Sequence, residues 1–591
     1  MRVRSHILPD GRQHPLKDRP QCFFPDNNNN LLGVVMDPFT ENGQTIPAEL
    51  NPQGFETVPD LLAYACRNYA ERPAFTSFGR TLNYAELDRL SAAFAVYLQQ
   101  HTSLKPGDRI AVQMPNLIQY PVVVYGAMRA GMVVVNTNPL YTASEMEHQF
   151  RDSGAKALVI HKSMAHNADK IIQNTDIKYT FVTQVGDLHG FVKRTLLNAA
   201  VKYLKKMEPK YQLPGAIDLR HALLSCVGET PTYVIRKPAD MAVLQYTGGT
   251  TGVSKGAVLS HANLVSNALQ AHKLIKGAGE GWAEDVISPL PLYHIYAFTL
   301  SQLVVLEGGH SVLIPNPRDI DGFVKELTRW RFSAFVGLNT LFVALCNNET
   351  FQRLDFSRLQ VTCSGGMALT QAAASQWEHV TGCGIIEGYG LTETSPGVTF
   401  NPPGEAQIGT IGLPLAATDV RILGPDGKEQ PVDEPGDLCV KGPQVMQGYW
   451  QREKETLATF TDEGYLVTGD IAVRQADGYI RLVDRAKDLI IVSGFNVYPN
   501  EIEDVICLHP NVLECAAIGV PDEVSGEVVK VVLVAKQEMT REEIRDWCRE
   551  RLTRYKIPRL VEFTDELPKT NVGKVLRRAL REPQQSEIDA A

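Results

Sequence analysis

The sequence predicts an α/β protein with two parts. One is a large N-terminal body of mostly parallel βα subdomains plus a β-rich unit, and the other is a small, mobile α+β C-terminal domain. From about Thr57 to residue 400, short apolar runs alternate with amphipathic stretches, as in parallel strands joined by helices. After Asn401 short strands are split by PDG and ADG turns, and a second βα set begins beyond residue 485.

The elements of the body follow in order. Within VPDLLAYACRNYAERPAF (58–75), an amphipathic helix is predicted. Asp60 lies near its start, and Pro73 follows its end. RIAVQMP, AGMVVVNT and AKALVIH predict apolar strands that are each followed by a helix-like stretch, and SAFVGL and LQVTCSGG continue the series. We therefore expect sheets that are covered by helices on both faces.

The domain boundaries come from changes in composition. Residues 1–45, with a basic start and an NNNN run, are predicted to be a disordered extension. The body takes 46–484, with its β-rich unit at about 401–484, and 485–487 form a hinge before the C-terminal domain, 488–591. In that domain CAAIGV and VVKVVLVAKQ predict strands and TREEIRDWCRERL predicts a helix. Two bodies joined by a single crossing are expected to move relative to each other.

Composition excludes several classes of protein. A net charge of −9 argues against a nucleic-acid partner, which would require an excess of Lys and Arg. The ten cysteines contain no CxxC pair, so we expect reduced, mostly buried thiols in a cytoplasmic protein and neither a zinc knuckle nor a disulfide framework. The longest apolar runs fall short of the roughly 20 residues that a membrane span needs, so no transmembrane anchor is predicted.

The segment YTGGTTGVSKG (246–256) predicts a loop that holds a polyphosphate. Its glycines let the backbone amides approach an anion, its hydroxyls add donors, and Lys255 supplies a positive charge. It is not a Walker loop, because Lys255 follows Ser254 and precedes Gly256. The alternative for glycines alone is a surface loop. The polar residues of the loop are Thr247, Thr250, Thr251, Ser254 and Lys255, and its glycines are Gly248, Gly249, Gly252 and Gly256.

Two further segments carry groups suited to a nucleotide. In EGYGLTET (387–394), Tyr389 offers a face for a base, Thr392 a phosphate donor, and Glu393 an oxygen ligand for Mg²⁺. The alternative is a turn with a helix N-cap. Asp470 in YLVTGDIA is suited to accept ribose hydroxyls, although TGD by itself is typical of a plain turn.

Basic residues follow toward the C-terminus. Arg485 and Lys487 lie at the domain junction, where the alternative is solvated surface charge. Lys574 lies in the turn of PKTNVGKVLRRAL, and its neighbours Lys569, Arg577 and Arg578 are interpreted as a basic tail.

Together with the junction segment DRAKDLIIVSGFNVYPNEIE (484–503), these make five segments. In their order and spacing, the chain resembles the adenylate-forming (acyl-activating, AMP-binding) superfamily from about Thr57 to Arg581. Four stretches, MPNLIQYPVVVYGAMRAGMVVVNTNPLYT, PLPLYHIYAFTL, GPQVMQGYWQR and VSGFNVYPNEIEDV, are similar to the bacterial long-chain fatty-acid–CoA ligases of that superfamily. The resemblance implies that ATP, a fatty acid and CoA become acyl-CoA, AMP and pyrophosphate through a bound acyl-adenylate, with Mg²⁺ as cofactor. It also implies that the C-terminal domain rotates about Lys487 between the two half-reactions.

The resemblance implies a role for each matching residue. The catalytic residues would be Lys574, Thr250, Glu393 and His294, of which Thr250 and Glu393 share the Mg²⁺. ATP or AMP would be bound by Thr247, Gly248, Gly249, Thr250, Thr251, Gly252, Lys255, Gly365, Gly388, Tyr389, Gly390, Thr392, Asp470, Arg485 and Lys574. CoA would be bound by Ser493, Gly494 and Phe495, and the acyl chain by His294 and Gly337.

Some positions depart from the family pattern, and other functions stay open. Ser254 stands where proline is common, and Tyr465 and Val467 stand where fatty-acyl ligases often have Trp and a basic or polar residue. Alternatives are a medium-chain or aryl-CoA ligase, a luciferase-like relative, an adenylation module for a carrier protein, and a non-catalytic nucleotide or lipid binder. We expect peripheral contact with the inner face of the membrane, and a homodimer is one open option.

Overall fold

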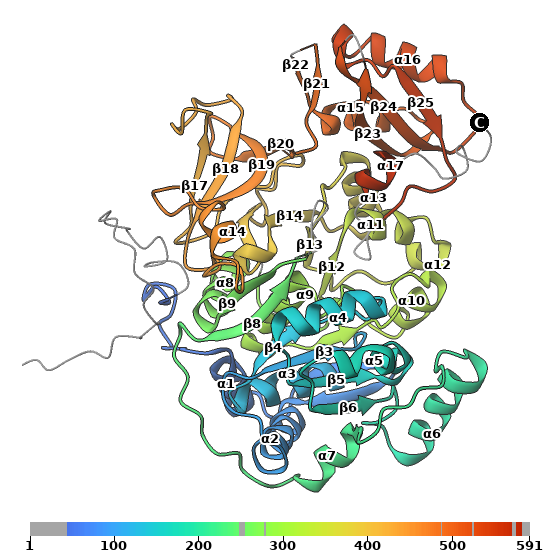
Figure 1. The fold of residues 1–591 in the computed structure, drawn as a ribbon. Coiled ribbons are helices and arrows are strands. Elements are labelled where there is room, and N and C mark those ends of the chain that lie inside the picture. The colour runs from blue at the N-terminus through green and yellow to red at the C-terminus, as the bar shows by residue number, and fades with distance from the viewer. Residues whose placement is uncertain are drawn as a thin grey trace, which may run out of the picture. The chain divides into compact units, whose positions relative to one another are not determined.

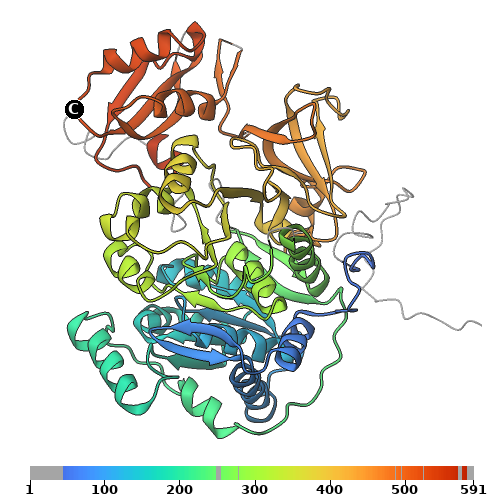
Figure 2. The ribbon, with the colours of Figure 1, turned by 180° about the vertical axis from the view of Figure 1, so that it is seen from behind.

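Two mostly parallel sheets organise the N-terminal body (Figures 1 and 2). The structure, a computed structural model, describes residues 44–247, 254–276, 279–485, 487–493, 495–522, 525–569 and 575–581. Within these residues, one sheet has the strand order β7-β6-β5-β3-β4-β8-β9 and is parallel except for its last pair. The strands are β7 (Ile217–Asp218), β6 (Tyr179–Thr183), β5 (Ala157–His161), β3 (Arg109–Gln113), β4 (Val133–Asn136), β8 (Met241–Tyr246) and β9 (Gly256–Ser260).

The second sheet has the order β16-β15-β14-β13-β12-β10-β11-β1-β2 in the described chain. It is parallel from β14 to β1 and has antiparallel strands at both ends. The strands are β16 (Leu413–Pro414), β15 (Gly397–Phe400), β14 (Ile385–Gly390), β13 (Val361–Gly365), β12 (Ala334–Gly337), β10 (Val286–Ser288), β11 (Ser311–Leu313), β1 (Pro73–Ser77) and β2 (Arg80–Asn83). The predicted α/β class and the strands predicted from their apolar runs are confirmed.

Both sheets are covered by helices on both faces. Successive residues of a strand therefore point alternately into the hydrophobic cores on its two faces. In β4, Val134 enters the core between the two sheets, whereas Val133 and Val135 enter the core on the outer face. In β12, Val336 and Phe335 divide in the same way. The inner helices are α1 (Val58–Asn68), α2 (Tyr84–His101), α3 (Gln119–Arg129), α8 (His261–Ile275) and α9 (Ile295–Leu306); the outer ones include α4 (Ala143–Ser153), α5 (Ala165–Ile171), α10 (Ile320–Leu327), α11 (Asn339–Cys346), α12 (Glu349–Gln352) and α13 (Gln371–Thr381).

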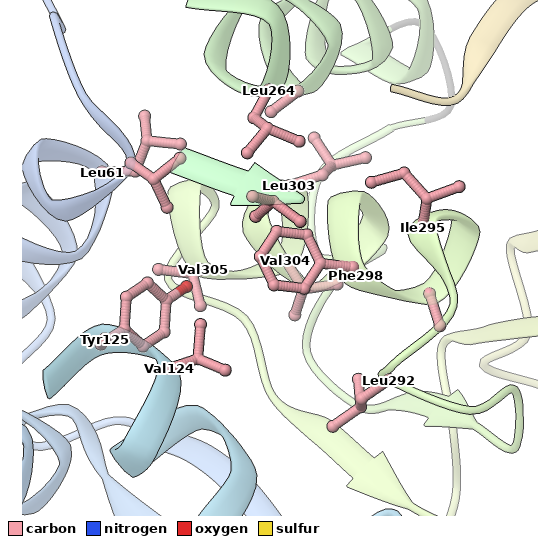
Figure 3. Close-up of a cluster of buried hydrophobic side chains, with 14 of the residues drawn as sticks. Leu61, Val124, Tyr125, Leu264, Leu292, Ile295, Phe298, Leu303, Val304 and Val305 are labelled. Atoms are coloured by element: carbon pink, nitrogen blue, oxygen red, sulfur yellow. The ribbon is translucent and has the colours of Figure 1, made fainter. Parts of the chain in front are cut away.

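Helix α9 is apolar on nearly every side because it lies inside this core. Figure 3 shows Phe298, Leu303 and Val304 of α9 among side chains of α1, α3 and α8. Most of the aliphatic residues of α9 therefore pack in the core. Core packing is the alternative to an acyl-binding role for the segment YHIYAFTL. Among the described residues, no helix is both long and apolar enough to cross a bilayer. All nine described cysteines are free thiols, and most are buried, as expected.

The β-rich unit is an antiparallel sheet of β17 (Asp419–Leu423), β18 (Gly436–Lys441), β19 (Leu466–Arg474) and β20 (Ile480–Arg485). The short helix α14 (Glu453–Leu457) lies between β18 and β19 in the sequence. Beyond the β-rich unit, the C-terminal residues form an α+β unit. Its sheet has the strand order β22-β21-β24-β23, and β25 pairs with β24. Its elements are β21 (Ile490–Val492), β22 (Phe495–Val497), α15 (Pro499–Cys507), β23 (Val512–Asp522), β24 (Gly526–Ala535), α16 (Arg541–Arg549), β25 (Leu560–Phe563) and α17 (Arg577–Arg581). The disordered extension predicted for 1–45 falls almost wholly outside the described residues.

Candidate active site

The glycine- and threonine-rich segment joins β8 to β9, which form an antiparallel hairpin. One more backbone hydrogen bond follows just beyond the strand ends, where the Thr247 N–H donates to the Lys255 carbonyl at 2.9 Å. The Ser254 hydroxyl donates to the Thr247 carbonyl at 2.5 Å. Ser254, the residue that departs from the family pattern, therefore closes the base of the loop. The predictions for Gly248, Gly249, Thr250, Thr251 and Gly252 lie outside the described residues.

Tyr449 connects this loop to the EGYGLTET segment. It is not among the site residues predicted from the sequence. Its ring centroid lies 5.0 Å from Lys255 Nζ, a distance at which a cation is attracted to a π face. Its hydroxyl donates to Glu393 Oε1 at 2.7 Å. Burial, followed by the charge of Glu393, raises the pKa of Tyr449, so the phenol keeps its proton. One side chain thus contacts a predicted phosphate ligand and a predicted metal ligand.

The backbone fixes Tyr449 in this position. Residues 447–450 pair with β9 through hydrogen bonds from Gln447 N–H to Val258 O, from Val258 N–H to Gly448 O, and from Trp450 N–H to Gly256 O. The Met446 N–H donates to the Glu393 carbonyl at 2.7 Å. The only sequence signal was that Tyr449 falls within GPQVMQGYWQR, a stretch that was noted for its resemblance alone.

A second cluster joins Tyr389, Asp470 and Arg485. The Tyr389 hydroxyl donates to Asp470 Oδ2 at 2.5 Å, and Arg485 Nε lies 3.2 Å from Asp470 Oδ1. Asp470 and Arg485 are direct partners on β19 and β20. Burial, followed by Asp470, raises the pKa of Tyr389, which keeps this phenol a donor as well. The pairing with Asp470 also means that Arg485 is not merely a solvated surface charge.

One alternative from the sequence is wrong, and another is correct in part. TGD is no plain turn, because Asp470 lies within β19, where the register with β18 shifts between Asp437 and Cys439. Such bulges commonly re-aim side chains near functional sites. The alternative of a turn with a helix N-cap is correct for the turn, because Thr392–Thr394 form a 3₁₀ turn, but the N-cap is Leu391 and not Thr392.

The glycines of EGYG are required by packing. A Cβ on Gly388 would lie 2.1 Å from the Phe400 ring, and one on Gly390 would lie 1.9 Å from the Pro396 carbonyl oxygen. A Cβ on Gly365, at the end of β13, would lie 3.1 Å from Tyr296 Cζ. The backbone near Tyr389 therefore admits no side chain at Gly388 or Gly390.

A small apolar cavity is lined by the two segments that carry the predicted acyl-binding residues, although neither of those residues is in its lining. His294 caps α9, where its Nδ1 accepts from the Tyr296 N–H at 3.3 Å, and Gly337 ends β12. The cavity is lined mainly by aliphatic side chains of the 288–304 segment and by Val336, and it measures about 10 Å³. That is room for about one water, so the cavity in this conformation does not hold a long acyl chain.

The junction with the C-terminal residues is held by a buried carboxylate. Asp484 Oδ2 accepts from the Asn500 N–H of α15 at 2.8 Å, and Oδ1 accepts from the Arg485 N–H at 2.7 Å. Burial raises the pKa of Asp484 to about 6 despite these bonds. Lys487, the predicted hinge, is exposed two residues beyond β20. Its hinge role stays a prediction.

Two of the predicted CoA-binding residues, Ser493 and Phe495, lie on the β21–β22 hairpin. The Ser493 N–H donates to the Ser525 carbonyl at 2.7 Å. Phe495 is 56% exposed, and its ring stacks on Tyr555 with 4.9 Å between centroids. Gly494 and Lys574 lie outside the described residues, so their roles stay predictions.

The basic-tail interpretation is wrong for Arg577 and Lys569. The Arg577 guanidinium contacts both carboxylate oxygens of Glu503 at 2.8 Å and donates to Asn500 Oδ1 at 2.8 Å. Lys569 pairs with Glu514 at 2.7 Å. Both basic residues tie the end of the chain to its own domain, because α17 packs on β23.

The described residues contain no group of three or more His, Cys, Asp or Glu arranged to hold a metal ion by itself. Mg²⁺ in nucleotide sites usually needs only one or two carboxylates together with substrate phosphates and water. The carboxylate of Glu393, oriented by Tyr449, fits that requirement.

Comparisons with known proteins agree with this geometry. Residues 62–450 match the family model "AMP-binding enzyme", and 501–574 match "AMP-binding enzyme C-terminal domain". The chain is 51% identical to a protein of Yersinia pestis and 49% identical to one of Escherichia coli O6:H1, both named long-chain-fatty-acid–CoA ligase. The matches cover 91% and 92% of this chain and 96% and 97% of those proteins.

A solved structure, ATP-bound MatB from Rhodopseudomonas palustris, superposes with a TM-score of 0.77 at 29% identity, covering 88% of this chain and 98% of that one. The resemblance inferred from the five segments is thereby confirmed. The chain belongs to the AMP-binding enzyme family.

Proposed function

We propose that this protein is a long-chain fatty-acid–CoA ligase. It converts ATP, a fatty acid and CoA to acyl-CoA, AMP and pyrophosphate through a bound acyl-adenylate. The observation that carries the proposal is that one segment, 387–394, takes part in both polar clusters. Tyr389 contacts Asp470, and Glu393, four residues later, contacts Tyr449 and through it Lys255. The relatives' shared name supports a fatty acid as the acid substrate.

The two clusters suit opposite ends of ATP. The Asp470 carboxylate, held by Tyr389 and Arg485, is an acceptor for ribose hydroxyls. Lys255 at the base of the glycine-rich loop supplies positive charge for the β- and γ-phosphates. Mg²⁺, held by Glu393 and by Thr250 of the loop, would neutralise charge on the phosphates when bound. The Tyr449 hydroxyl orients the Glu393 carboxylate for this role.

The chemistry needs two half-reactions. A fatty-acid carboxylate is a poor electrophile, and its attack on the α-phosphorus replaces pyrophosphate and makes a mixed anhydride. The CoA thiol then attacks the acyl carbon and expels AMP. We propose that Lys574 bridges the carboxylate and the α-phosphate in the first half-reaction. Rotation about Lys487 then brings Ser493, Gly494 and Phe495 to the thiol.

The substitution Lys574→Ala tests whether Lys574 serves only the first half-reaction. Loss of one preorganised charge donor typically costs on the order of 10²–10³ in rate. We expect Lys574→Ala to lose adenylate formation by at least this factor, while thioester formation from supplied acyl-AMP changes little. An equal loss in both half-reactions would contradict the assignment of Lys574.

The substrate class is tested by CoA consumption with ATP, Mg²⁺ and a panel of acids from acetate to stearate together with aromatic acids. We expect long-chain acids to have the highest kcat/KM. A preference for short-chain or cinnamate-type acids would favour the medium-chain or aryl-CoA ligase instead. Pyrophosphate release that does not depend on any acid would contradict the ligase assignment.

We also propose that the protein works in the cytoplasm against the inner face of the membrane, into which long-chain fatty acids partition. Co-flotation with membrane vesicles tests this location. A homodimer stays an expectation, and sedimentation at several protein concentrations tests it.

A further inference from the structure

Helix α6 (Phe191–Ala199) and the π-helical turn η3 (Ala200–Leu204) that continues it expose large apolar side chains. Phe191 is 73% exposed, Leu196 is 65% exposed and Leu204 is 81% exposed. Val192, Tyr203 and Met207 are also more than half exposed. Figures 1 and 2 both show α6 at the outer margin of the N-terminal body, beyond the seven-stranded sheet. Apolar residues exposed in such a group mark an interaction surface.

The side of α6 that faces the protein is polar. Asn198 Oδ1 accepts from the Gly186 N–H at 2.8 Å, and Asn198 Nδ2 donates to Gln184 Oε1 at 3.3 Å. At the start of the helix, Lys193 Nζ donates to the Gly79 carbonyl at 3.1 Å. A surface helix normally buries its apolar stripe and exposes its polar side. Here the orientation is reversed.

We call the exposed apolar residues of 191–207 the apolar stripe. Val192 and Leu196 lie four residues apart within α6, which keeps them on one side of the helix. Tyr203 and Leu204 belong to η3, and Met207 follows it in the chain. Phe78, which is 40% exposed, belongs to the β1–β2 turn that Lys193 contacts.

The charge around the stripe is strongly basic. Residues 191–210 contain six basic residues, Lys193, Arg194, Lys202, Lys205, Lys206 and Lys210, and a single acidic one. That acidic residue, Glu208, has a side chain only 2% exposed, and Lys162 Nζ lies 3.5 Å from its carboxylate. The whole chain carries a net charge of −9, so this segment departs from the rest of the molecule in sign.

We propose that the 191–207 surface docks on an anionic phospholipid bilayer, with its apolar stripe in the interface and its lysines at the lipid phosphates. A basic helix with large exposed apolar side chains is the usual element for lying in that interface. Each basic residue near such a surface contributes attraction that the acidic remainder of the protein does not supply. A second copy of the chain is a poorer occupant, because a two-fold contact through this surface would bring like charges together.

The proposal deepens the membrane contact suggested by the proposed function, because a long-chain acid is extracted from the bilayer. The docking itself depends only on residues outside both polar clusters. Vesicle binding and ligase activity can therefore fail independently, and each outcome is attributable to its own proposal.

The experiment is sedimentation of the full chain with vesicles of phosphatidylcholine alone or mixed with phosphatidylglycerol. The charge variant is Lys202→Gln/Lys205→Gln/Lys206→Gln, and the apolar variant is Leu196→Ser/Tyr203→Ser/Leu204→Ser. Matched controls are Lys428→Gln, whose lysine side chain is 83% exposed, and Leu508→Ser, whose leucine is 68% exposed. Activity toward a short, water-soluble acid without vesicles checks that each variant folds.

We expect the wild type and both controls to bind the mixed vesicles and to bind phosphatidylcholine much more weakly. Removal of three lysines should weaken binding about 100-fold, at about fivefold per charge. The apolar variant should lose at least about tenfold. Unaltered binding by either variant, equal binding to both kinds of vesicle, or no vesicle binding by the wild type would overturn the proposal. So would a wild-type dimer that the apolar variant converts to monomers without vesicle binding, because the surface would then serve self-association.

Discussion

Replacing Tyr449 with Phe tests whether this side chain positions the Glu393 carboxylate. The substitution removes the hydroxyl that donates to Glu393 Oε1 at 2.7 Å, and it keeps the ring that lies 5.0 Å from Lys255 Nζ. A hydrogen bond to a charged group contributes about 1.5–3 kcal/mol. Because Tyr449 is half-buried, we take the lower part of this range, which corresponds to about 10- to 50-fold in rate.

The assay is fatty-acid-dependent exchange between ATP and pyrophosphate over a range of Mg²⁺ concentrations. We expect Tyr449→Phe to lower the exchange rate and to raise the Mg²⁺ concentration that gives half the maximal rate. Tyr465→Phe is the matched control, since the Tyr465 hydroxyl donates to the Asp419 carboxylate in the β-rich unit and should leave the Mg²⁺ dependence unaltered. If Tyr449→Phe stayed within twofold of the wild type in both quantities, the positioning role would be refuted.

Three further substitutions test other parts of the account. Burial raises the pKa of Glu387 to about 8 from its ordinary value of 4.5, so its contribution to stability is present at acid pH and is lost as the pH rises through about 8. Between pH 5 and 9 the free energy of unfolding, measured by urea titration, should fall less for Glu387→Gln than for the wild type. The two decreases should differ by on the order of 4 kcal/mol, and parallel pH profiles would contradict this. Arg577→Met leaves Glu503 without its guanidinium partner and should destabilise the C-terminal domain by about 2–4 kcal/mol in thermal unfolding, whereas adding Glu503→Gln should restore part of the loss. Ser254→Ala removes the hydrogen bond at the loop base, worth about 0.5–1.5 kcal/mol, so the KM for ATP should rise about two- to tenfold with little change in kcat; an unchanged KM would show that Ser254 does not shape the loop.

Much of the fold could be predicted from the sequence, because strands that are buried on both faces are continuous apolar runs. RIAVQMP and AKALVIH therefore indicated β3 and β5 directly. Asp470 was harder to place. Thr-Gly-Asp is typical of a turn, and its place in a strand depends on the pairing of β19 with β18 and β20.

The missed residues depend on partners that are distant in sequence. Tyr449 reaches Glu393 only because residues 447–450 pair with β9, which lies almost two hundred residues earlier. Arg577 resembled a tail residue because Glu503 is 74 positions away. For α6, periodicity indicates an amphipathic helix but does not indicate which side faces the protein.

The most direct measurement of the central claim follows the oxygen atoms of the substrate carboxylate. A fatty acid labelled with heavy oxygen in its carboxyl group is converted to acyl-CoA, and the AMP and pyrophosphate are analysed by mass spectrometry. If the carboxylate attacks the α-phosphorus and the thiol then expels AMP, each AMP must carry one labelled oxygen and the pyrophosphate none. Unlabelled AMP, or label in pyrophosphate or phosphate, would contradict the acyl-adenylate route.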